Sequence, residues 1–461
     1  MTIDATDRWL SELELSTVFE MLRDNGVTEA VYKVLPRNAN SKNQVYLGTD
    51  LSQLGKLPSG EVTAHLSVSE KSGKQEAVFR APLEFYWLNA EGLPQLAPNA
   101  QLIFYPQYPE VRFSGFLRGC RTAPSSLWVK EKRGQEPDRI LVLGIGDDRK
   151  IIALTLPPES PAAREIRATE PHDPYGALYV LRMPGEAHID GFRDLMRELC
   201  RIHRLLWVPS TRLDPSGALV PCSGSNCNGN TLESLLGIRS NGYSLPDFRG
   251  WEVKARQVTN VDSPGASTVT LFTPEPTGGV YMADGLATFL KRYGYPDTKG
   301  REDRLNFGGL HRSGRAPHSR TGLRLVVSGY VSPKKFAPDG SVQLIDAHDH
   351  VAASWSFAKL MDHWKVKHAA AAFVPVQKKN EPEQQYRFGR QVLLGEGAEF
   401  GLLLDAMYSG KVYYDPGIKL EGVNTDSPKP KKRSQFRVAS RNLPSLYESS
   451  RLVDVCDQAS R

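Results

Sequence analysis

Long apolar segments and a secretory signal are both missing from the sequence. No run of about 18 apolar residues, the length that a membrane-spanning helix needs, occurs in the chain. The first residues, MTIDATDRWLSELEL, are acidic and contain no apolar core, so we predict no secretory signal. Five cysteines among 461 residues are too few, and odd in number, to indicate a disulfide framework. We therefore expect a cytoplasmic protein with no membrane partner.

Two motifs of common enzyme classes are also missing. The sequence has no phosphate-binding loop, which argues against an NTP-driven motor, and no Gly-x-Ser-x-Gly motif of a serine hydrolase. What is present is an ordinary globular composition, with 40% hydrophobic and 24% charged residues. The length allows two or three domains, each with its own core.

Positive charge is unevenly distributed along the chain, whose formal net charge is +6. Residues 304–338 and 429–441 contain basic residues but no acidic ones. Such clusters are typical of a phosphate-binding surface, and a solvated charged face is the alternative. A catalytic site beside these basic runs would favour the phosphate-binding interpretation. The basic residues are Arg304, Arg312, Arg315, Arg320, Arg324, Lys334 and Lys335 in the first run, and Lys429, Lys431, Lys432, Arg433, Arg437 and Arg441 in the second.

The N-terminal part, residues 1–207, is predicted to be rich in short strands. Turns containing Pro or Gly separate its apolar runs, which favours a small barrel or sandwich. A capping box at Thr17–Glu20 predicts a helix that ends near Gly26. Apolar residues at helical spacing predict a second helix over residues 186–207, which either closes this domain or leads into the next. The predicted strands are residues 30–35, 44–47, 62–67, 77–79, 102–105, 140–145 and 150–156.

Residues 208–230 are rich in Pro, Gly, Ser and Asn and predict a linker or a long surface loop. Cys222 and Cys227 in this segment have no partner pair at zinc-finger spacing, so a structural zinc site is not favoured. Residues 231–461 alternate between helical and strand patterns, which indicates an α/β or α+β domain. Its predicted helices are residues 231–236, capped by Asn230 or Thr231, 281–293 and 355–368, and its predicted strands are residues 250–255, 267–272, 323–330 and 342–346. Residues 373–376 and 401–406 are apolar runs that fit either a strand or a helix.

The segment most informative about chemistry is PDFRGWEVK, residues 246–254. Side chains alternate along a strand, so Glu252 and Lys254 should share one face while Val253 points toward the core. Asp247, in the turn before the strand, should reach the same point. Two carboxylates beside a lysine suit a hard cation such as Mg²⁺, which activates water and neutralises charge on a phosphate. Lys254 would orient that water or stabilise the developing negative charge.

The spacing P-D-x4-E-x-K is common by chance, and an exposed strand of alternating charge is the simpler interpretation of it in isolation. Its surroundings favour the catalytic interpretation. Glu233, on the preceding predicted helix, supplies a third carboxylate, and both basic runs follow in the same domain. An acidic metal site surrounded by positive surface is what a nuclease requires.

Several motifs around this segment resemble the MvaI/BcnI restriction endonuclease family. They are GNTLE at 229–233, LGI at 236–238, NG at 241–242, PDFxGWEVK at 246–254, LFTxxP at 271–276, RLNF at 304–307 and QFR at 435–437. The family is related to the mismatch-repair nicking enzyme MutH and belongs to the PD-(D/E)xK nucleases. The resemblance covers roughly residues 225–447.

This resemblance implies a restriction-endonuclease-like PD-(D/E)xK fold for residues 231–461. It implies that Asp247 and Glu252 are metal ligands, that Lys254 is the catalytic lysine, and that Glu233 is the helix carboxylate of the site. Recognition residues of the family lie in the C-terminal part of the nuclease domain. There we nominate as DNA contacts Lys432, Arg433 and Arg437.

The segment YKVLPRNANSKNQ, residues 32–44, followed by VTAH at 62–65, resembles the effector domain of the restriction enzyme EcoRII, a DNA-binding pseudobarrel. The side chains agree with that interpretation in part, because cations suit phosphates and amides suit base edges. A polar β-turn is the alternative. The candidate phosphate contacts are Lys33, Arg37 and Lys42, and the candidate base contacts are Asn38, Asn40, Asn43 and Gln44. Arg112, Arg118 and Arg121 are candidates for a second DNA-contacting arm. The alternative is an edge strand whose arginines are solvated.

The sequence therefore predicts a type II restriction endonuclease that hydrolyses double-stranded DNA with Mg²⁺. A cognate DNA methyltransferase would be its genetic partner. The protein would act as a monomer or a homodimer, since one active site cuts one strand. Two alternatives stay open, a strand-nicking endonuclease of the MutH type and a catalytically silent DNA-binding protein.

Overall fold

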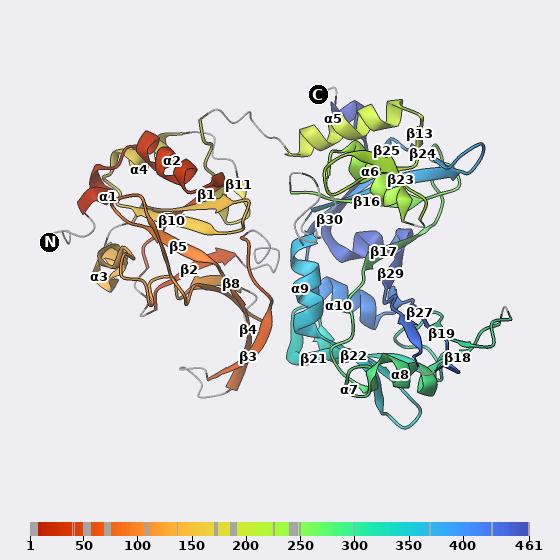
Figure 1. Cartoon of the computed structure of the whole chain (residues 1–461). Helices are drawn as coiled ribbons and strands as arrows, with labels where there is room; N and C mark the ends of the chain where they lie inside the picture. The colour runs from red at the N-terminus through yellow and green to blue at the C-terminus, as the bar shows by residue number, and fades with distance from the viewer. Residues whose placement is uncertain are drawn as a thin grey trace. The chain divides into compact units, whose positions relative to one another are not determined.

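The computed structural model describes residues 8–459 except 39, 41, 49–56, 69–74, 107–109, 136, 170–173, 185–190, 225, 239–247, 249, 299, 368–369 and 426. The chain forms two compact units, Met1–His188 and Ile189–Arg461, shown in Figure 1. In the described ranges, no helix is long and apolar enough to cross a membrane.

The first unit is built on a seven-stranded sheet in the order β11-β12-β1-β9-β10-β5-β6. Its central strands β9 and β10, with sequences RILVLGIG and IIALTL, are buried along almost their whole length, as expected of strands covered on both faces. Helices α2 and α4 cover one face of this sheet (Figure 1). The bounds are α1 (Arg8–Glu12), α2 (Leu15–Asp24), α4 (Pro161–Ala168), β1 (Val27–Leu35), β5 (Phe85–Leu88), β6 (Pro94–Leu96), β9 (Arg139–Gly146), β10 (Ile151–Leu156), β11 (Pro174–Tyr175) and β12 (Leu178–Val180).

A second sheet of the same unit has five strands in the order β2-β8-β7-β4-β3. Between the sheets lies an aromatic core in which the rings of Phe85, Phe113 and Phe116 are in contact and fully buried. The strands predicted for this unit are confirmed, whereas a pseudobarrel topology stays a prediction. The bounds are β2 (Gln44–Gly48), β3 (Thr63–Val68), β4 (Gln75–Pro82), β7 (Gln101–Tyr105), β8 (Glu110–Ser114), the 3-10 helix η3 (Ser125–Trp128) and α3 (Lys130–Gln135).

The predicted capping box in the first unit is wrong. Helix α2 begins at Leu15, so Thr17 lies inside the helix, and its N-cap residue Glu14 makes no side-chain cap hydrogen bond. Apolar residues Leu15, Val18 and Leu22 on the buried face of the helix determine where it starts. The predicted end is confirmed, because Gly26 follows the helix with a φ of 73°, which favours glycine.

The second unit is organised around a sheet in the order β13-β24-β23-β25-β30, with β16 pairing parallel to β23. Helices α5 and α11, with part of α6, pack on one face and bury a shared apolar cluster. A disulfide between Cys200 and Cys456 joins α5 to α11. The bounds are α5 (Gly191–Arg204), α6 (Cys227–Leu235), α11 (Val455–Ala459), β13 (Trp207–Pro209), β16 (Glu252–Gln257), β23 (Ala370–Lys379), β24 (Gln385–Phe388), β25 (Gln391–Ala398) and β30 (Tyr447–Asp454).

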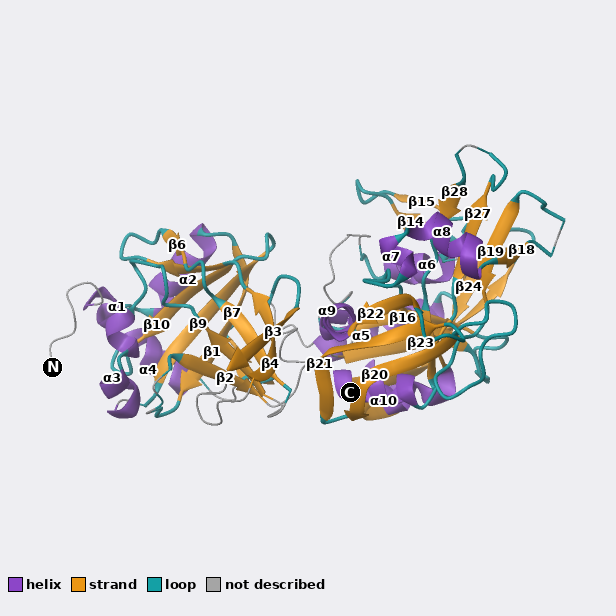
Figure 2. Cartoon of the chain, turned by 90° about the horizontal axis from the view of Figure 1, so that it is seen from below, coloured by secondary structure: helices purple, strands orange, loops and turns teal. Residues whose placement is uncertain are grey.

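The second unit also contains sheets in the orders β17-β29-β26, β18-β19-β27-β28 and β20-β21-β22, so that it mixes helices and strands throughout (Figure 2). The helix predicted over residues 281–293 is two helices, because Gly285 breaks it with a φ of 82°. The bounds are β17 (Thr268–Phe272), β18 (Tyr295–Pro296), β19 (Arg304–Gly308), β20 (Arg324–Ser332), β21 (Lys335–Ile345), β22 (Val351–Ser356), β26 (Val412–Tyr414), β27 (Gly417–Glu421), β28 (Lys429–Lys431), β29 (Phe436–Ala439), α7 (Val280–Ala283), α8 (Gly285–Tyr293), α9 (Phe357–Lys367), α10 (Phe400–Tyr408) and the 3-10 helix η4 (Ser440–Leu446).

The boundary between the units differs from the predicted one at residue 207. Helix α5 buries its apolar face in the core of the second unit and therefore belongs to that unit. Residues 208–230, predicted as a linker or loop, contain strands β14 (Thr211–Leu213) and β15 (Leu219–Pro221) and the beginning of α6. The polar composition of residues 208–230 gave no sign of these short elements. They form because Val208 and Cys227 anchor the segment in the core.

The number of cysteines did not indicate a disulfide framework, yet the structure pairs Cys222 with Cys227 and Cys200 with Cys456. Cys200 and Cys456 are separated by 256 residues in sequence, so the packing of α5 on α11 alone brings their sulfur atoms together. Cys120 is a free, buried thiol.

Candidate active site

Strand β16 presents the predicted catalytic pair from one face. It runs parallel to β23, with Glu252 opposite Ala371 and Lys254 opposite Phe373. Val253, between them in sequence, points to the other face and is buried in the cluster beneath α5. The alternation predicted from the sequence is therefore what the strand shows.

The two side chains of the pair are in direct contact. The Nζ atom of Lys254 lies 2.8 Å from Oε1 of Glu252, and the side chains are 17% and 3% exposed, respectively. The other oxygen, Oε2 of Glu252, is buried and has no hydrogen-bond partner among the described residues. Burial of a carboxylate oxygen without a partner is costly, so a cation or a donor is expected there. A hard divalent cation, which prefers carboxylate oxygen, fits this atom.

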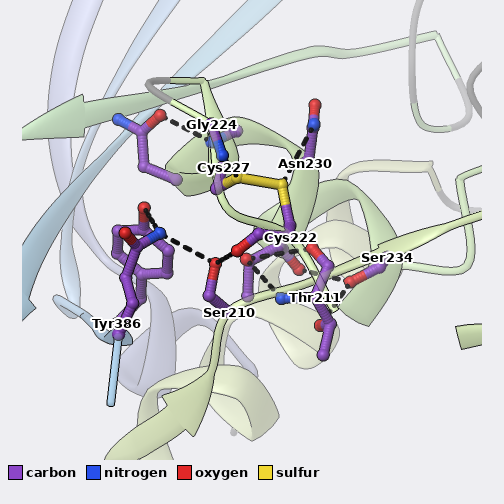
Figure 3. Close-up of a disulfide and its surroundings, with 12 residues drawn as sticks. Ser210, Thr211, Cys222, Gly224, Cys227, Asn230, Ser234 and Tyr386 are labelled. Carbon is purple, nitrogen blue, oxygen red and sulfur yellow. Dashed lines mark hydrogen bonds between the residues drawn. A yellow bond between two sulfur atoms is a disulfide. The ribbon is translucent and has the colours of Figure 1, made fainter. Parts of the chain in front are cut away.

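Helix α6, which carries the half-buried Glu233, packs against β16. Its beginning is fixed by the Cys222–Cys227 disulfide and by hydrogen bonds to the preceding strands, drawn in Figure 3. Ser210 Oγ donates to the carbonyl oxygen of Cys222 at 2.7 Å, and Thr231 Oγ1 donates to the carbonyl oxygen of Thr211 at 3.1 Å. These contacts hold the helix that positions Glu233.

The predicted cap of this helix at Asn230 or Thr231 is wrong. The helix begins at Cys227, with Asn226 as its N-cap residue, so both candidates lie inside it. The Nδ2 group of Asn230 instead lies 3.6 Å from Sγ of Cys222 (Figure 3). The apolar pattern did not reveal the first turn because its sequence, CNGN, is mostly polar.

Asp247, the second predicted metal ligand, lies outside the described residues. Among the residues that are described, no three His, Cys, Asp or Glu side chains gather closely enough to hold a metal ion. The structure thus shows one candidate ligand oxygen, on Glu252, and the complete ligand set stays a prediction.

The model of the MvaI/BcnI restriction endonuclease family matches residues 196–447. The chain belongs to this family. The matched range starts within α5 and contains Glu233, Glu252 and Lys254. Family membership makes the protein a DNA-binding nuclease of the restriction endonuclease type, and it confirms the resemblance inferred from the sequence. The match does not extend to residues 1–195, so the resemblance of that part to the EcoRII effector domain stays a prediction.

Two solved structures of MvaI are also similar to this member of the family. Restriction endonuclease MvaI in complex with its cognate DNA is 18% identical, with a TM-score of 0.43, and the alignment covers 58% of this chain and 99% of that one. MvaI without DNA is also 18% identical, with the same coverage and a TM-score of 0.32. These scores are too low to add to the argument. A comparison with curated proteins found no match.

The three C-terminal residues nominated as DNA contacts in this restriction endonuclease differ in their availability. Lys432 and Arg433 are exposed on the segment between β28 and β29, with Lys432 Nζ 3.6 Å from a carboxylate oxygen of Glu275. Arg437 is half-buried on β29, where its Nη1 lies 2.6 Å from Oδ2 of Asp415. Lys432 and Arg433 are therefore the better placed for phosphate, while Arg437 would have to exchange its carboxylate partner.

Within the first basic run, residues 309–323 form a loop that a buried histidine anchors. His311 is 2% exposed, its Nε2 lies 2.9 Å from Oγ1 of Thr321, and its Nδ1 lies 3.1 Å from the carbonyl oxygen of Gly309. Burial and, secondly, the nearby His318 lower the pKa of His311 to about 3. A neutral imidazole thus holds a loop on which Arg315 and Arg320 are exposed.

In the first unit, a buried arginine contacts the predicted DNA-contacting segment, residues 32–44, at Asn38 and Asn40. Arg133 is 2% exposed, and its guanidinium donates from Nη1 to the carbonyl oxygen of Asn38 at 3.3 Å and from Nη2 to that of Asn40 at 2.8 Å. Its own carbonyl oxygen accepts from the backbone N–H of Asn38 at 2.8 Å. This clamp leaves the side chains of Arg37 and Lys42 exposed.

Two other residues predicted in that segment, Lys33 and Gln44, are engaged within the unit. Lys33 Nζ donates to the carbonyl oxygen of Ala177 at 2.7 Å, and burial lowers the pKa of Lys33. Gln44 Oε1 accepts from Arg112 at 2.8 Å. Asn43 is half-buried, and its Oδ1 has no hydrogen-bond partner in the described part of the chain.

Sequence reasoning missed Tyr447, the first residue of β30. It is 5% exposed, and its hydroxyl group has no hydrogen-bond partner among the described residues. Burial and the negative charge of Glu252 raise the pKa of Tyr447 well above its ordinary value. No sequence signal marks it, because it lies beyond the motif at residues 435–437 and reaches the site only through sheet pairing.

Proposed function

We propose that this restriction endonuclease hydrolyses phosphodiester bonds of double-stranded DNA in a Mg²⁺-dependent reaction catalysed by the second unit. The observation that carries the proposal is the Glu252–Lys254 pair, in which one carboxylate oxygen holds the lysine and the other is buried with no hydrogen-bond partner among the described residues. The family supports nuclease activity, and this pair supports the location of the site.

The candidate residues would have separate roles in such a site. Bound Mg²⁺ would supply a water of lowered pKa and neutralise charge on the scissile phosphate. Glu252 and Asp247 would hold the ion, with Glu233 as a third carboxylate from α6. Lys254, fixed by Oε1 of Glu252, would orient the attacking water or stabilise the charge that develops on the phosphate oxygens.

DNA binding is proposed for both units. In the second unit, Lys432 and Arg433 would contact phosphates, with Arg437 joining once released from Asp415. In the first unit, Arg37 and Lys42 are the exposed cations of the segment that Arg133 clamps. The further candidates in the first unit are Lys33, which donates to the carbonyl oxygen of Ala177, and the amide side chains of Asn38, Asn40, Asn43 and Gln44.

The biological setting proposed is type II restriction in the cytoplasm, with a cognate DNA methyltransferase as genetic partner. The chain carries one Glu252–Lys254 pair, so cleavage of both strands requires a homodimer or two successive nicks by a monomer. The same consideration keeps a MutH-like nicking activity as the second candidate function. Supercoiled plasmid that accumulates as nicked circles without linear product would favour that second function.

The experiment that tests the proposal uses unmethylated phage DNA with purified full-length protein, in Mg²⁺ or in EDTA. Discrete fragments that appear with Mg²⁺ alone are expected, because hydrolysis depends on the ion and base recognition makes the cuts site-specific. Intact DNA in both conditions, on unmodified and modified substrates alike, would contradict nuclease activity and leave the catalytically silent DNA-binding protein.

A further inference from the structure

A row of small residues crosses the sheet beside the candidate catalytic carboxylate. Glu252 on β16 is in register with Ala371 on β23, and Ala371 is in register with Gly395 on β25. Residues in register share a face of the sheet, so all three lie on the face of Glu252. Ala371 and Gly395 lack bulky side chains, which leaves room over this row.

The ring of Tyr447 occupies that room. A Cβ atom added to Gly395 would lie 2.5 Å from Cδ2 of Tyr447, so the ring rests directly on the glycine backbone. The ring also contacts Phe373, the register partner of Lys254, with centroids 6.1 Å apart and ring planes at 68°. The phenol thus packs on Gly395, in the row of Glu252, and against Phe373, the register partner of Lys254.

Tyr447 and Glu252 each carry a buried polar atom of complementary type. The hydroxyl group of Tyr447 and Oε2 of Glu252 are both buried, and neither has a hydrogen-bond partner in the described part of the chain. One is a donor and the other an acceptor, and leaving both unsatisfied would cost the fold the desolvation of each. The electrostatic effect of Glu252 on the Tyr447 hydroxyl, which acts to raise its pKa, agrees with their closeness.

We propose that Tyr447 is a positioning residue for Glu252: its hydroxyl group donates to Oε2 through a bridging water and so orients the carboxylate toward a divalent cation. The inference rests on the proposed function of the same site. Groups that hydrogen-bond a metal-ligating carboxylate fix its orientation, and their removal typically weakens metal binding about tenfold or more.

The variant that tests this is Tyr447→Phe, which removes the hydroxyl group and keeps the ring over Gly395. Mn²⁺ binding to the full chain, measured by calorimetry without DNA, should weaken about tenfold or more relative to wild type. Cleavage lost at low Mg²⁺ should return as Mg²⁺ is raised, since the carboxylate itself remains. The matched control is Tyr386→Phe, a buried hydroxyl on β24 that accepts from Gln384 at 2.9 Å, and it should leave the Mn²⁺ Kd unchanged.

A second measurement needs neither metal nor activity. The urea midpoints of Tyr447→Phe, Glu252→Gln and the double variant form a thermodynamic cycle, and the two single shifts should not add if the groups are paired. Additive shifts together with an unchanged Mn²⁺ Kd in Tyr447→Phe would overturn the inference while leaving nuclease activity intact. A wild-type protein that binds no Mn²⁺ would instead contradict the proposed metal-dependent function, and the cycle would still decide the pairing.

Discussion

Lys254 and Glu252 form an asymmetric pair, in which the ammonium group lies 2.8 Å from one carboxylate oxygen while the other oxygen is buried without a partner in the described chain. An ion pair that serves the fold alone normally has its remaining oxygen satisfied. Here one oxygen fixes the lysine and the other stays available, which is the arrangement that a metal-dependent hydrolytic site needs. The account of the second unit depends on this relationship.

Lys254→Ala should lower the rate of DNA cleavage by about 100-fold or more, because the charge that develops on the phosphate loses its stabilising cation. Binding of duplex DNA should persist, since most of the affinity comes from phosphate contacts elsewhere. Single-turnover cleavage and a gel-shift titration measure the two effects. Lys379→Ala, a lysine on β23 whose Nζ lies 4.8 Å from the ring centre of Trp207, is the control and should cut normally. Normal cutting by Lys254→Ala would remove Lys254 from the site.

Lys432→Ala and Arg433→Ala should each weaken DNA binding. Each should also reduce the slope of log affinity against log salt by about one, because one phosphate contact is lost. Arg437→Ala should change the slope less, because the guanidinium already neutralises Asp415. Affinities of the Glu252→Gln protein, measured between low and moderate salt, provide the slopes. Arg390→Ala, whose guanidinium binds Asp454 and Asp457 on the surface, is the control, and equal slopes in all variants would refute the assignment.

Arg133→Lys should weaken DNA binding through the first unit. A lysine keeps the charge but lacks the forked guanidinium, whose two terminal nitrogens donate separately to the carbonyl oxygens of Asn38 and Asn40, so these two residues lose their shared anchor. The affinity of the full chain for duplex DNA at low salt should fall several-fold. Arg167→Lys, which disrupts similar bonds to the carbonyl oxygens of Asp138 and Pro158, should not change it. Equal affinities for the two variants would show that the segment does not contact DNA.

The stability of the protein should fall as the pH drops below about 6.5, in part because of His311. Its pKa is about 3 in the folded state and near 6.5 when unfolded, so only the unfolded chain takes up the proton in this range. At pH 5 this linkage removes about 2 kcal/mol relative to pH 8. Urea unfolding of wild type and His311→Phe at both pH values measures it, and the variant should show a smaller loss. The exposed His348→Gln should behave as wild type, and an unchanged pH dependence in His311→Phe would refute the role of His311.

The site was more predictable from the sequence than its surroundings. Glu252, Val253 and Lys254 follow the two-residue repeat of a strand, and that repeat determines which side chains share a face whatever the sheet pairs with. Tyr447 could not be predicted, because its position depends on pairing β30 with β25 and on the missing side chain of Gly395. Such long-range register has no local signal.

The disulfides and the boundary of the second unit could not be predicted from the sequence for a related reason. Cys200 and Cys456 are brought together only when α5 packs on α11, and this packing also assigns α5 to the nuclease unit. The short strands β14 and β15 and the first turn of α6 are held by tertiary contacts such as the one between Thr231 and Thr211, and not by an apolar repeat. Composition therefore indicated a loop where the fold forms a support for Glu233.

The most direct test of the central claim compares single-turnover cleavage of a mapped duplex substrate by wild type, Glu252→Gln and Asp262→Asn in saturating Mg²⁺. Asp262→Asn removes a carboxylate charge from an exposed pair with Arg387, at 3.0 Å, and serves as the matched control. Wild type and Asp262→Asn should cut at the same rate, while Glu252→Gln binds DNA without cutting it. Cleavage by Glu252→Gln at the wild-type rate would contradict the assignment of the active site to β16.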